Sequence, residues 1–275
     1  MSQLQAFLLG IIQGLTEFIP VSSTAHLLIG QKILGLPADD VMFSFIVLVQ
    51  IGTIVSLLIY FWKDLITIFM DTLKNLGGLR KFESLPANAK LGWYIVIATI
   101  PALLAGYLLK DAVEALFRLP LLEASIRLFT AAILLTLAEW LTKKDRQLDS
   151  MTWLDALVVG LFQIIAVFPG ASRSGSTISG GMFCNFDRPS AARFAFLMSV
   201  PVMLAAGAYE MLNVVRMPGL TEFLPALVVG FITAAIVGWF AVRWLLGYLA
   251  GHSLYVFSAY CAAVGTIVLI FHFAL

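Results

Sequence analysis

The sequence predicts an all-α polytopic membrane protein made of two inverted-topology repeats, each a re-entrant helical hairpin followed by three transmembrane helices. Three observations lead to this fold class. Hydrophobic residues make up 61% of the chain and charged residues only 12%, and the mean hydropathy is +0.97, far from the balance of a soluble domain. Two long apolar segments are interrupted by short stretches rich in proline and serine. The second half of the chain also weakly repeats the pattern of the first.

The first interrupted segment covers residues 4–34. As one helix it would be about 46 Å long, too long for one crossing of a roughly 30 Å hydrocarbon core, and Pro20, Ser22 and Ser23 interrupt it. Each half is too short to span. We therefore expect a re-entrant helical hairpin, which is tolerated at membrane depth where other helices or water satisfy the freed backbone groups.

The remainder of the first repeat, which covers about residues 1–146, supplies three spans. Residues 41–62 form an apolar stretch that ends in aromatic residues suited to the membrane interface. Residues 63–90 are polar and mixed in charge, which predicts a loop or a surface helix. Further spans are expected at 92–109 and 125–142.

The second repeat, about residues 150–275, begins as the first does, so that 1–275 form one membrane domain. At an offset of 150, Gly10, Gln13, Phe18 and Ser22 fall on Gly160, Gln163, Phe168 and Ser172. Its interrupted segment, 152–186, is broken by the sequence PGASRSGS, and spans are expected at 192–214, 222–244 and 253–273. Three spans per half is an odd number, so equivalent halves must stand in opposite senses across the bilayer.

The basic residues predict the orientation, because Lys and Arg accumulate on the cytoplasmic side. In this topology one side carries Lys63, Lys74, Arg80, Lys81, Lys90, Lys143, Lys144, Arg146, Arg188, Arg193 and Arg243, and the other carries Lys32, Lys110, Arg118 and Arg216. We therefore expect both termini and the mouth of the first hairpin outside, and the second hairpin entering from the cytoplasm. The two polar hairpin tips would then meet near the midplane.

Several classes of function are excluded by composition and pattern. A net charge of +1 lacks the basic face that a nucleic-acid partner requires. Neither a G-x-x-x-x-G-K-[ST] phosphate loop nor an H-E-x-x-H zinc motif is present. The two cysteines, Cys184 and Cys261, fit no disulfide framework or metal-ligand spacing and are interpreted as packing residues.

The first tip carries a carboxylate, an amide, hydroxyls and an imidazole within 14 residues, QGLTEFIPVSSTAH at 13–26. Gln13 and Glu17 are four apart, so both project from one helix face. A carboxylate in hydrocarbon costs roughly 2.5–3.5 kcal/mol, so Glu17 should face a watered, protein-lined cavity. Ser22 fits a helix cap, and His26 follows Ser23 by three residues, which predicts that both lie on one helix face.

The second tip is typical of an anion site. In its sequence, PGASRSGST at 169–177, proline and glycine end one half-helix and the hydroxyl-rich segment starts the next. The free N–H groups of that helix start would converge with the Arg173 guanidinium. Thr177 lies four residues after Arg173 and can face the same anion. The planar fork of arginine suits phosphate.

Together the two tips form a set suited to phosphoryl transfer. Arg173 would hold the phosphate, Ser23 would act as nucleophile, and His26 would take its proton or protonate the leaving oxygen. Glu17 and Gln13 would bind a divalent cation or orient His26. The structural alternatives are a buried Glu17 and His26 pair that fixes helix packing and an Arg173 anchored to backbone carbonyls.

The two tip sequences resemble the signatures of the undecaprenyl-diphosphate phosphatase family (BacA type), and the resemblance extends over the whole chain. It implies a bacterial inner-membrane enzyme that converts undecaprenyl diphosphate to undecaprenyl phosphate at the periplasmic face, recycles this lipid carrier for cell-wall synthesis and confers bacitracin resistance. By motif position, the implied functional residues are Gln13, Glu17, Ser23, His26, Ser172, Arg173 and Thr177.

The resemblance also implies Mg²⁺ or Ca²⁺, although the family has Glu or Gln at the position of Gln13, and Gln leaves one carboxylate for the metal. The nucleophile is open among Ser23, His26 and a metal-bound water, and a homo-oligomer is an open alternative to a monomer. A second function, transport or scrambling of polyprenyl phosphates, is favoured by the inverted repeat with opposed hairpins. Transport would need the anion site, but it would not need a nucleophile aligned with an acid or base.

Overall fold

A computed structural model describes residues 1–108, 120–166, 171–214 and 220–274. Within these residues the chain is helical and forms no β-strand, and six helices are long and apolar enough to cross a membrane. They are α3 (Asp40–Tyr60), α5 (Ala87–Leu108), α7 (Pro120–Leu141), α10 (Arg188–Val214), α11 (Leu220–Leu249) and α12 (Tyr255–Ala274). The predicted all-α polytopic class is confirmed, with each expected span matched by one of these helices.

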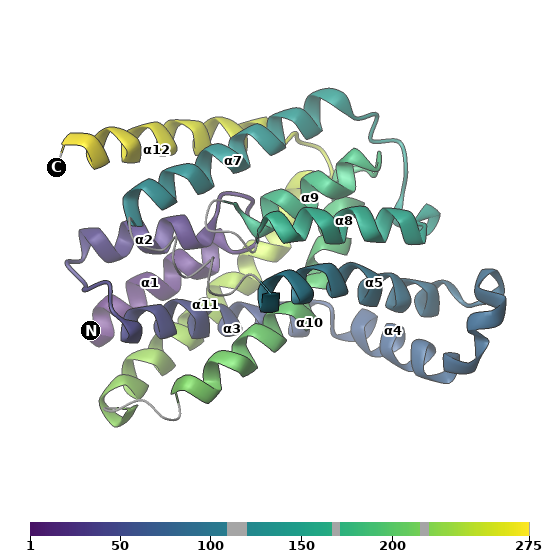
Figure 1. Ribbon diagram of the computed structural model, residues 1–275, viewed down its shortest axis with the longest axis horizontal. Coiled ribbons are helices and arrows are strands. Elements are labelled where there is room, and N and C mark those ends of the chain that lie inside the picture. The colour runs from purple at the N-terminus through teal and green to yellow at the C-terminus, as the bar shows by residue number, and fades with distance from the viewer. Residues whose placement is uncertain (109–119, 167–170, 215–219, 275) are drawn as a thin grey trace.

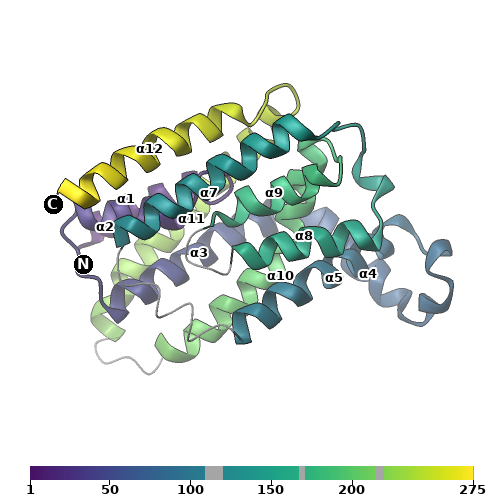
Figure 2. The same ribbon diagram turned by 45° about the horizontal axis from the view of Figure 1, so that its top comes forward.

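A pair of short helices precedes the three long helices in each half of the chain. The first pair is α1 (Gln3–Thr16) with α2 (Ser23–Ile33), and the second is α8 (Trp153–Ile165) with α9 (Arg173–Phe183). The members of each pair pack against each other. The pairs enter the bundle from opposite ends, so that the end of α1 and the start of α9 meet near its middle (Figures 1 and 2). Their re-entry into a bilayer and the opposite senses of the two halves stay predictions.

The two leading short helices start in the same way. The Ser2 side chain accepts from the N–H of Gln5 before α1, and Thr152 accepts from the N–H of Asp155 before α8. In both capping boxes the side chain of the third helical residue in turn accepts a hydrogen bond from the backbone N–H of the capping residue, so that two backbone donors at the helix start are satisfied. The sequence thus fixes where each hairpin begins.

Matching glycines of the two halves also make matching contacts. A Cβ added at Gly10 of α1 would lie 2.7 Å from the Gly230 carbonyl oxygen of α11, and one added at Gly160 of α8 would lie 2.6 Å from the Ala98 carbonyl oxygen of α5. Helix backbones can approach this closely only where the side chain is missing. Each leading helix is therefore seated directly on a long helix of the other half.

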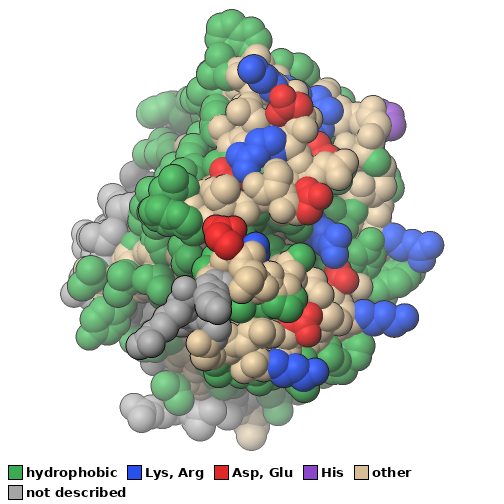
Figure 3. All heavy atoms as spheres, turned by 90° about the vertical axis from the view of Figure 1, so that its right-hand side faces the viewer, with side chains coloured by type: hydrophobic (Ala, Val, Ile, Leu, Met, Phe, Trp, Pro, Cys, Tyr) green, Lys and Arg blue, Asp and Glu red, His purple; other side chains and the backbone are tan. Residues whose placement is uncertain are grey.

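Charged side chains gather at one end of the bundle, where α4 and the connection between α7 and α8 lie (Figure 3). The expected loop or surface helix at 63–90 is a helix, α4 (Trp62–Lys74), followed by the 3-10 turn η1 (Leu76–Ser84). Another short 3-10 turn, η2 (Leu148–Ser150), precedes α8. Both termini lie at the opposite end (Figure 1). Residues used in the sequence analysis but outside the described ranges are Lys110, Arg118, Phe168, Pro169, Gly170 and Arg216.

Two ion pairs tie helix ends together at the charged end. Arg188, the first residue of α10, donates from Nε and Nη2 to the Glu139 carboxylate of α7 at 2.5 and 2.7 Å. Arg146 donates to both carboxylate oxygens of Asp155 in the first turn of α8, at 3.0 and 2.8 Å. These pairs hold α7, α8 and α10 in register near the start of the second hairpin.

Candidate active site between the two hairpin tips

The first tip places a carboxylate and an amide side by side. The N–H of Glu17 still donates to the Gln13 carbonyl, so the helical turn that began in α1 continues through Glu17. As expected for residues four apart, Gln13 Nε2 donates to Glu17 Oε2 at 2.7 Å, and both side chains are buried. Phe18 points away into the core and packs edge-on against Phe196 of α10. That contact anchors the tip.

The turn of the first tip brings Ser23 back to the carboxylate. Ser22 takes a positive φ of 68°, which reverses the chain after Pro20, and α2 begins at the next residue. Ser23 Oγ then donates to Glu17 Oε2 at 2.6 Å. Ser22 makes no side-chain capping bond, so its predicted role as a helix cap is wrong. Its backbone geometry, and not its hydroxyl, is what the turn uses.

The second tip starts α9 as the sequence predicts. Ser172 Oγ accepts from the N–H of Gly175 at 3.2 Å and caps the helix, so Arg173 becomes its first residue. The Thr177 hydroxyl donates to the Arg173 carbonyl at 2.8 Å, and its side chain is fully buried one turn deeper in α9. Ser172 therefore reaches the tip, whereas Thr177 supports it from within the helix.

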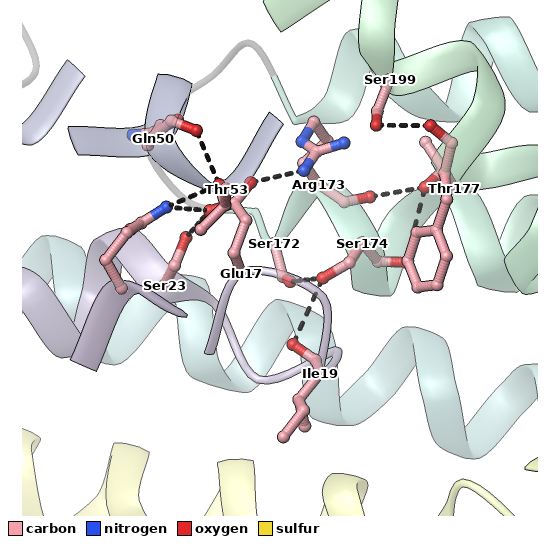
Figure 4. Close-up of polar contacts among 12 residues, drawn as sticks. Glu17, Ile19, Ser23, Gln50, Thr53, Ser172, Arg173, Ser174, Thr177 and Ser199 are labelled. Carbon is pink, nitrogen blue, oxygen red and sulfur yellow. Dashed lines mark hydrogen bonds and ion pairs between the residues drawn. The ribbon is translucent and has the colours of Figure 1, made fainter. Parts of the chain in front are cut away.

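The two tips meet through an ion pair. Arg173 Nη2 bonds to Glu17 Oε1, and Ser174 Oγ donates to the Ile19 carbonyl at 3.4 Å (Figure 4). Glu17 thus accepts hydrogen bonds from Gln13 and Ser23 on its own hairpin and from Arg173 on the other. The structure brings together four of the predicted site residues, Gln13, Glu17, Ser23 and Arg173, from segments 150 or more residues apart.

A cavity of about 120 Å³ lies beside this cluster. Its walls come from both hairpins, α3 and α7, and are formed by Glu17, Ser22, Ser23, Thr24, Gln50, Arg127, Ala166, Ala171, Ser172, Arg173 and Ser174. Hydroxyls, two guanidiniums and one carboxylate dominate the lining, which is unusual inside a bundle this apolar. Such a lining can bind an anion and exclude hydrocarbon.

His26 lies apart from the cluster. Its Nε2 is 2.8 Å from the Tyr260 hydroxyl of α12, its Nδ1 is 2.9 Å from the Ser22 carbonyl oxygen, and the His26 and Tyr260 rings stack. A spacing of three residues rotates a side chain by about 60° around a helix, so Ser23 and His26 diverge here. The role of His26 in catalysis stays a prediction.

The predicted metal ligands are Gln13 and Glu17. Gln13 Oε1 is buried and has no hydrogen-bond partner among the described residues, so an oxygen ligand is available beside the Glu17 carboxylate. Oxygen ligands suit Mg²⁺ and Ca²⁺. Within the described ranges no group of three or more His, Cys, Asp or Glu side chains could hold a metal. The donor set thus fits a hard cation only when the substrate supplies further oxygens.

Sequence reasoning missed three residues of the neighbourhood. Thr53 receives a weak 3.5 Å hydrogen bond from Gln13, Tyr260 holds His26, and Arg127 lines the cavity. Thr53 and Tyr260 carry no charge and stand in ordinary spans, so no pattern singles them out. Arg127 did carry a signal, because an arginine inside an apolar span needs a partner or a ligand.

Comparison with known proteins finds sequence relatives along almost the whole chain. A family model described as bacitracin resistance protein BacA matches residues 6–267. A protein of Prosthecochloris aestuarii named undecaprenyl-diphosphatase is 42% identical over 277 residues, covering 98% of this chain and 96% of its own length. Proteins of the same name from Chlorobium phaeovibrioides and Anaeromyxobacter sp. strain K are 40% and 41% identical and cover 98% and 96% of this chain and 97% and 90% of their own lengths.

Proposed function

The chain belongs to the bacitracin resistance protein BacA family, and we propose that it is an integral membrane phosphatase that hydrolyses undecaprenyl diphosphate to undecaprenyl phosphate and inorganic phosphate. One observation carries the proposal: Glu17, Ser23 and Arg173, contributed by opposed hairpins, meet beside one polar cavity. The names of the relatives supply the substrate. A cation, a hydroxyl and a carboxylate are the groups that phosphoryl transfer to a serine needs.

The terminal phosphate is held by the second tip. Arg173 is the first residue of α9, so its guanidinium and the free N–H groups of that helix start converge on the cavity. In the structure Glu17 forms an ion pair with Arg173. An incoming phosphate therefore replaces part of that contact and leaves the carboxylate beside the Ser23 hydroxyl.

Ser23 attacks the terminal phosphorus in this proposal. Its Oγ forms a bond to phosphorus while the bond from phosphorus to the bridging oxygen breaks, and the hydroxyl proton passes to Glu17, to which Ser23 already donates. Undecaprenyl phosphate leaves, and water hydrolyses the phosphoserine to free the enzyme. Trapping phosphoenzyme from labelled substrate should locate the label on Ser23. A label on His26 would replace this step with attack by the imidazole.

His26 is proposed to protonate the bridging oxygen as it leaves. For this the imidazole must turn away from the Tyr260 hydroxyl that it contacts now. Gln13 and Glu17 would hold Mg²⁺ or Ca²⁺ together with substrate oxygens, and the ion would supply positive charge to the phosphoryl oxygens. Ser172 contributes through the start of α9, and Thr177 through its bond to the Arg173 backbone.

Phosphate release from undecaprenyl diphosphate by the purified protein in detergent tests the proposal. Glu17→Ala and Arg173→Ala should each lower the rate at least about a thousandfold, because each removes a charge that acts on the reacting group. Arg146→Gln, which removes an arginine remote from the cavity, is the matched control and should keep the wild-type rate per folded molecule. Undiminished release by both cavity variants would reject the assignment.

The proposed setting is the bacterial inner membrane, with the cavity served from the periplasmic side and the product reused as lipid carrier for cell-wall synthesis. Overproduction should then raise bacitracin tolerance, and the Arg173→Ala variant should not. The substrate partner is undecaprenyl diphosphate within the membrane lipid, and a homo-oligomer is compatible with this proposal. Labelling of introduced cysteines from either side of intact cells tests the orientation.

Transport of polyprenyl phosphates is a second candidate, favoured by two hairpins that enter from opposite ends and touch at their tips. It uses the same anion site. Flux of a non-hydrolysable phosphonate lipid across proteoliposomes would support it. Hydrolysis without flux would leave the phosphatase alone.

A further inference from the structure

A second guanidinium borders the cavity. Arg127 of α7 is among the residues that line it, and only 7% of its side chain is exposed. Its Nη1 donates to the Ala171 carbonyl at 3.1 Å, one residue before the cap of α9. Ala131, four residues later on the same face of α7, lies 3.5 Å from the place where a Cβ of Gly175 would be. This face of α7 is therefore packed against the start of α9.

The countercharge of Arg127 lies outside the cavity wall. Glu123 Oε1 accepts a hydrogen bond from Arg127 Nε at 2.9 Å and forms an ion pair with Nη2 at 2.8 Å, and 4% of its side chain is exposed. Glu123 is one helical turn away and does not line the cavity. The Arg127 guanidinium therefore borders the cavity, whereas the Glu123 carboxylate with which it pairs lies outside the cavity lining.

The charges on the cavity wall are unequal. Arg173 and the carboxylate with which it pairs, Glu17, both line the cavity. Arg127 adds a second positive group to the lining. A buried ion pair is seldom a net source of stability, so stability alone does not account for placing one here. A headgroup with two phosphoryl groups, each at least singly ionised, matches two guanidiniums on one wall.

We propose that Arg127 binds the second phosphoryl group of the diphosphate, the one that stays on the lipid, and so makes the cavity prefer a diphosphate to a monophosphate. The identity of the lipid rests on the proposed function, whereas the preference for two linked phosphates does not. Hydrolysis removes the link between the two phosphoryl groups, so neither product spans both arginines. Arg127 therefore acts on substrate affinity and product release, and Arg173 on the reacting phosphate.

Inorganic pyrophosphate and orthophosphate are the probes, with thermal protection of the purified protein and competition with a short polyprenyl diphosphate as readouts. Arg127→Gln should weaken pyrophosphate binding at least about tenfold and orthophosphate binding less than about threefold. Glu123→Gln should instead strengthen pyrophosphate binding about threefold, because it removes the carboxylate charge that offsets the positive charge of Arg127. A merely structural pair would respond alike to the loss of either partner.

Arg127→Lys keeps the charge without the fork and should fall between wild type and Arg127→Gln. Either single variant leaves one buried charge and can fail to fold, so the double variant with both residues changed to Gln, which leaves none, is the second test. The double variant should fold and should no longer bind pyrophosphate in preference to orthophosphate. Arg146→Gln, which breaks a pair of the same chemistry outside the cavity, should keep it.

Equal weakening of both probes in Arg127→Gln and Glu123→Gln, or an unchanged preference in the double variant, would overturn the inference. Protection measurements need no turnover. If the wild type were protected as described but did not hydrolyse undecaprenyl diphosphate, the proposed function would fail and the role of Arg127 would stand.

Discussion

Arg173, at the start of α9, and Arg146, beside the start of α8, each pair with a carboxylate, yet their surroundings differ. Arg146 uses all five of its N–H groups: they reach both oxygens of Asp155, the hydroxyl and carbonyl of Ser150, and the Cys184 carbonyl. Arg173 borders a cavity, and within the described part of the chain its hydrogen-bond partner is Glu17 through Nη2. The Arg146 guanidinium is saturated by protein, whereas the described residues leave N–H groups of the Arg173 guanidinium for a ligand.

The difference shows how a structural arginine in an apolar helix bundle can be distinguished from one that binds a ligand. Both pairs carry the same charges, so the presence of an ion pair does not distinguish a structural site from a functional one. What distinguishes them is whether the protein fills the donor positions. At the charged end the N–H groups of Arg146 are all bonded and link the connection after α7 to α8 and α9. At the tips the described residues bond only part of the Arg173 guanidinium, which lies beside several hydroxyls.

Replacing each arginine by lysine should give the largest contrast. Arg173→Lys keeps a charge but loses the planar fork, and phosphate release should fall roughly a hundredfold. Arg146→Lys should change the rate per folded molecule by less than about threefold. Rates normalised to the folded fraction measure both. Equal losses in the two variants would remove the distinction between the two sites.

Stability should show the opposite order. Asp155→Asn removes the negative charge that pairs with Arg146. Because this pair is partly exposed, the free energy of unfolding should fall by about 2–3 kcal/mol. Glu17→Gln should lower the free energy of unfolding by less, because Arg173 borders a polar cavity. Thermal unfolding in detergent compares the two variants. A larger loss for Glu17→Gln would mean that the tip pair is the structural one.

A smaller effect concerns Cys184, which follows α9 at the charged end behind Arg146. Burial raises the pKa of its thiol to about 12. At pH 8 the thiol is then almost wholly protonated, and the thiolate is the form that reacts with maleimide. In a Cys261→Ser background, labelling should be slow in the wild type and faster in Asp155→Asn, where the contacts around Arg146 loosen. Fast labelling of the native protein at pH 8 would show that this end is open.

Much of this site could be predicted from the chain alone. Pro20, the serines around it and the four-residue spacing of Gln13 and Glu17 are local signals, and local signals determine where a helix breaks and which face a side chain takes. The same holds for Ser172, whose capping role follows from its place before α9. The meeting of Glu17 with Arg173 could be expected from the predicted repeat, because opposed hairpins of similar length would bring their tips to one depth.

The remainder depended on packing between distant helices. His26 turns to Tyr260 because α12 supplies a hydroxyl there, and nothing near His26 in the sequence indicates which helix will be its neighbour. Thr177 bonds within its own helix, a competition that short polar side chains often win. Arg127 joins the cavity only because α7 packs against both α2 and α9.

Binding measured separately from turnover tests the central claim, that Arg173 holds the phosphate while Glu17 serves the chemistry. With a non-hydrolysable diphosphate lipid, Glu17→Gln should bind at least as tightly as the wild type yet release almost no phosphate from the true substrate. Arg173→Ala should lose both binding and release. Wild-type binding by Arg173→Ala, or wild-type turnover by Glu17→Gln, would contradict the account.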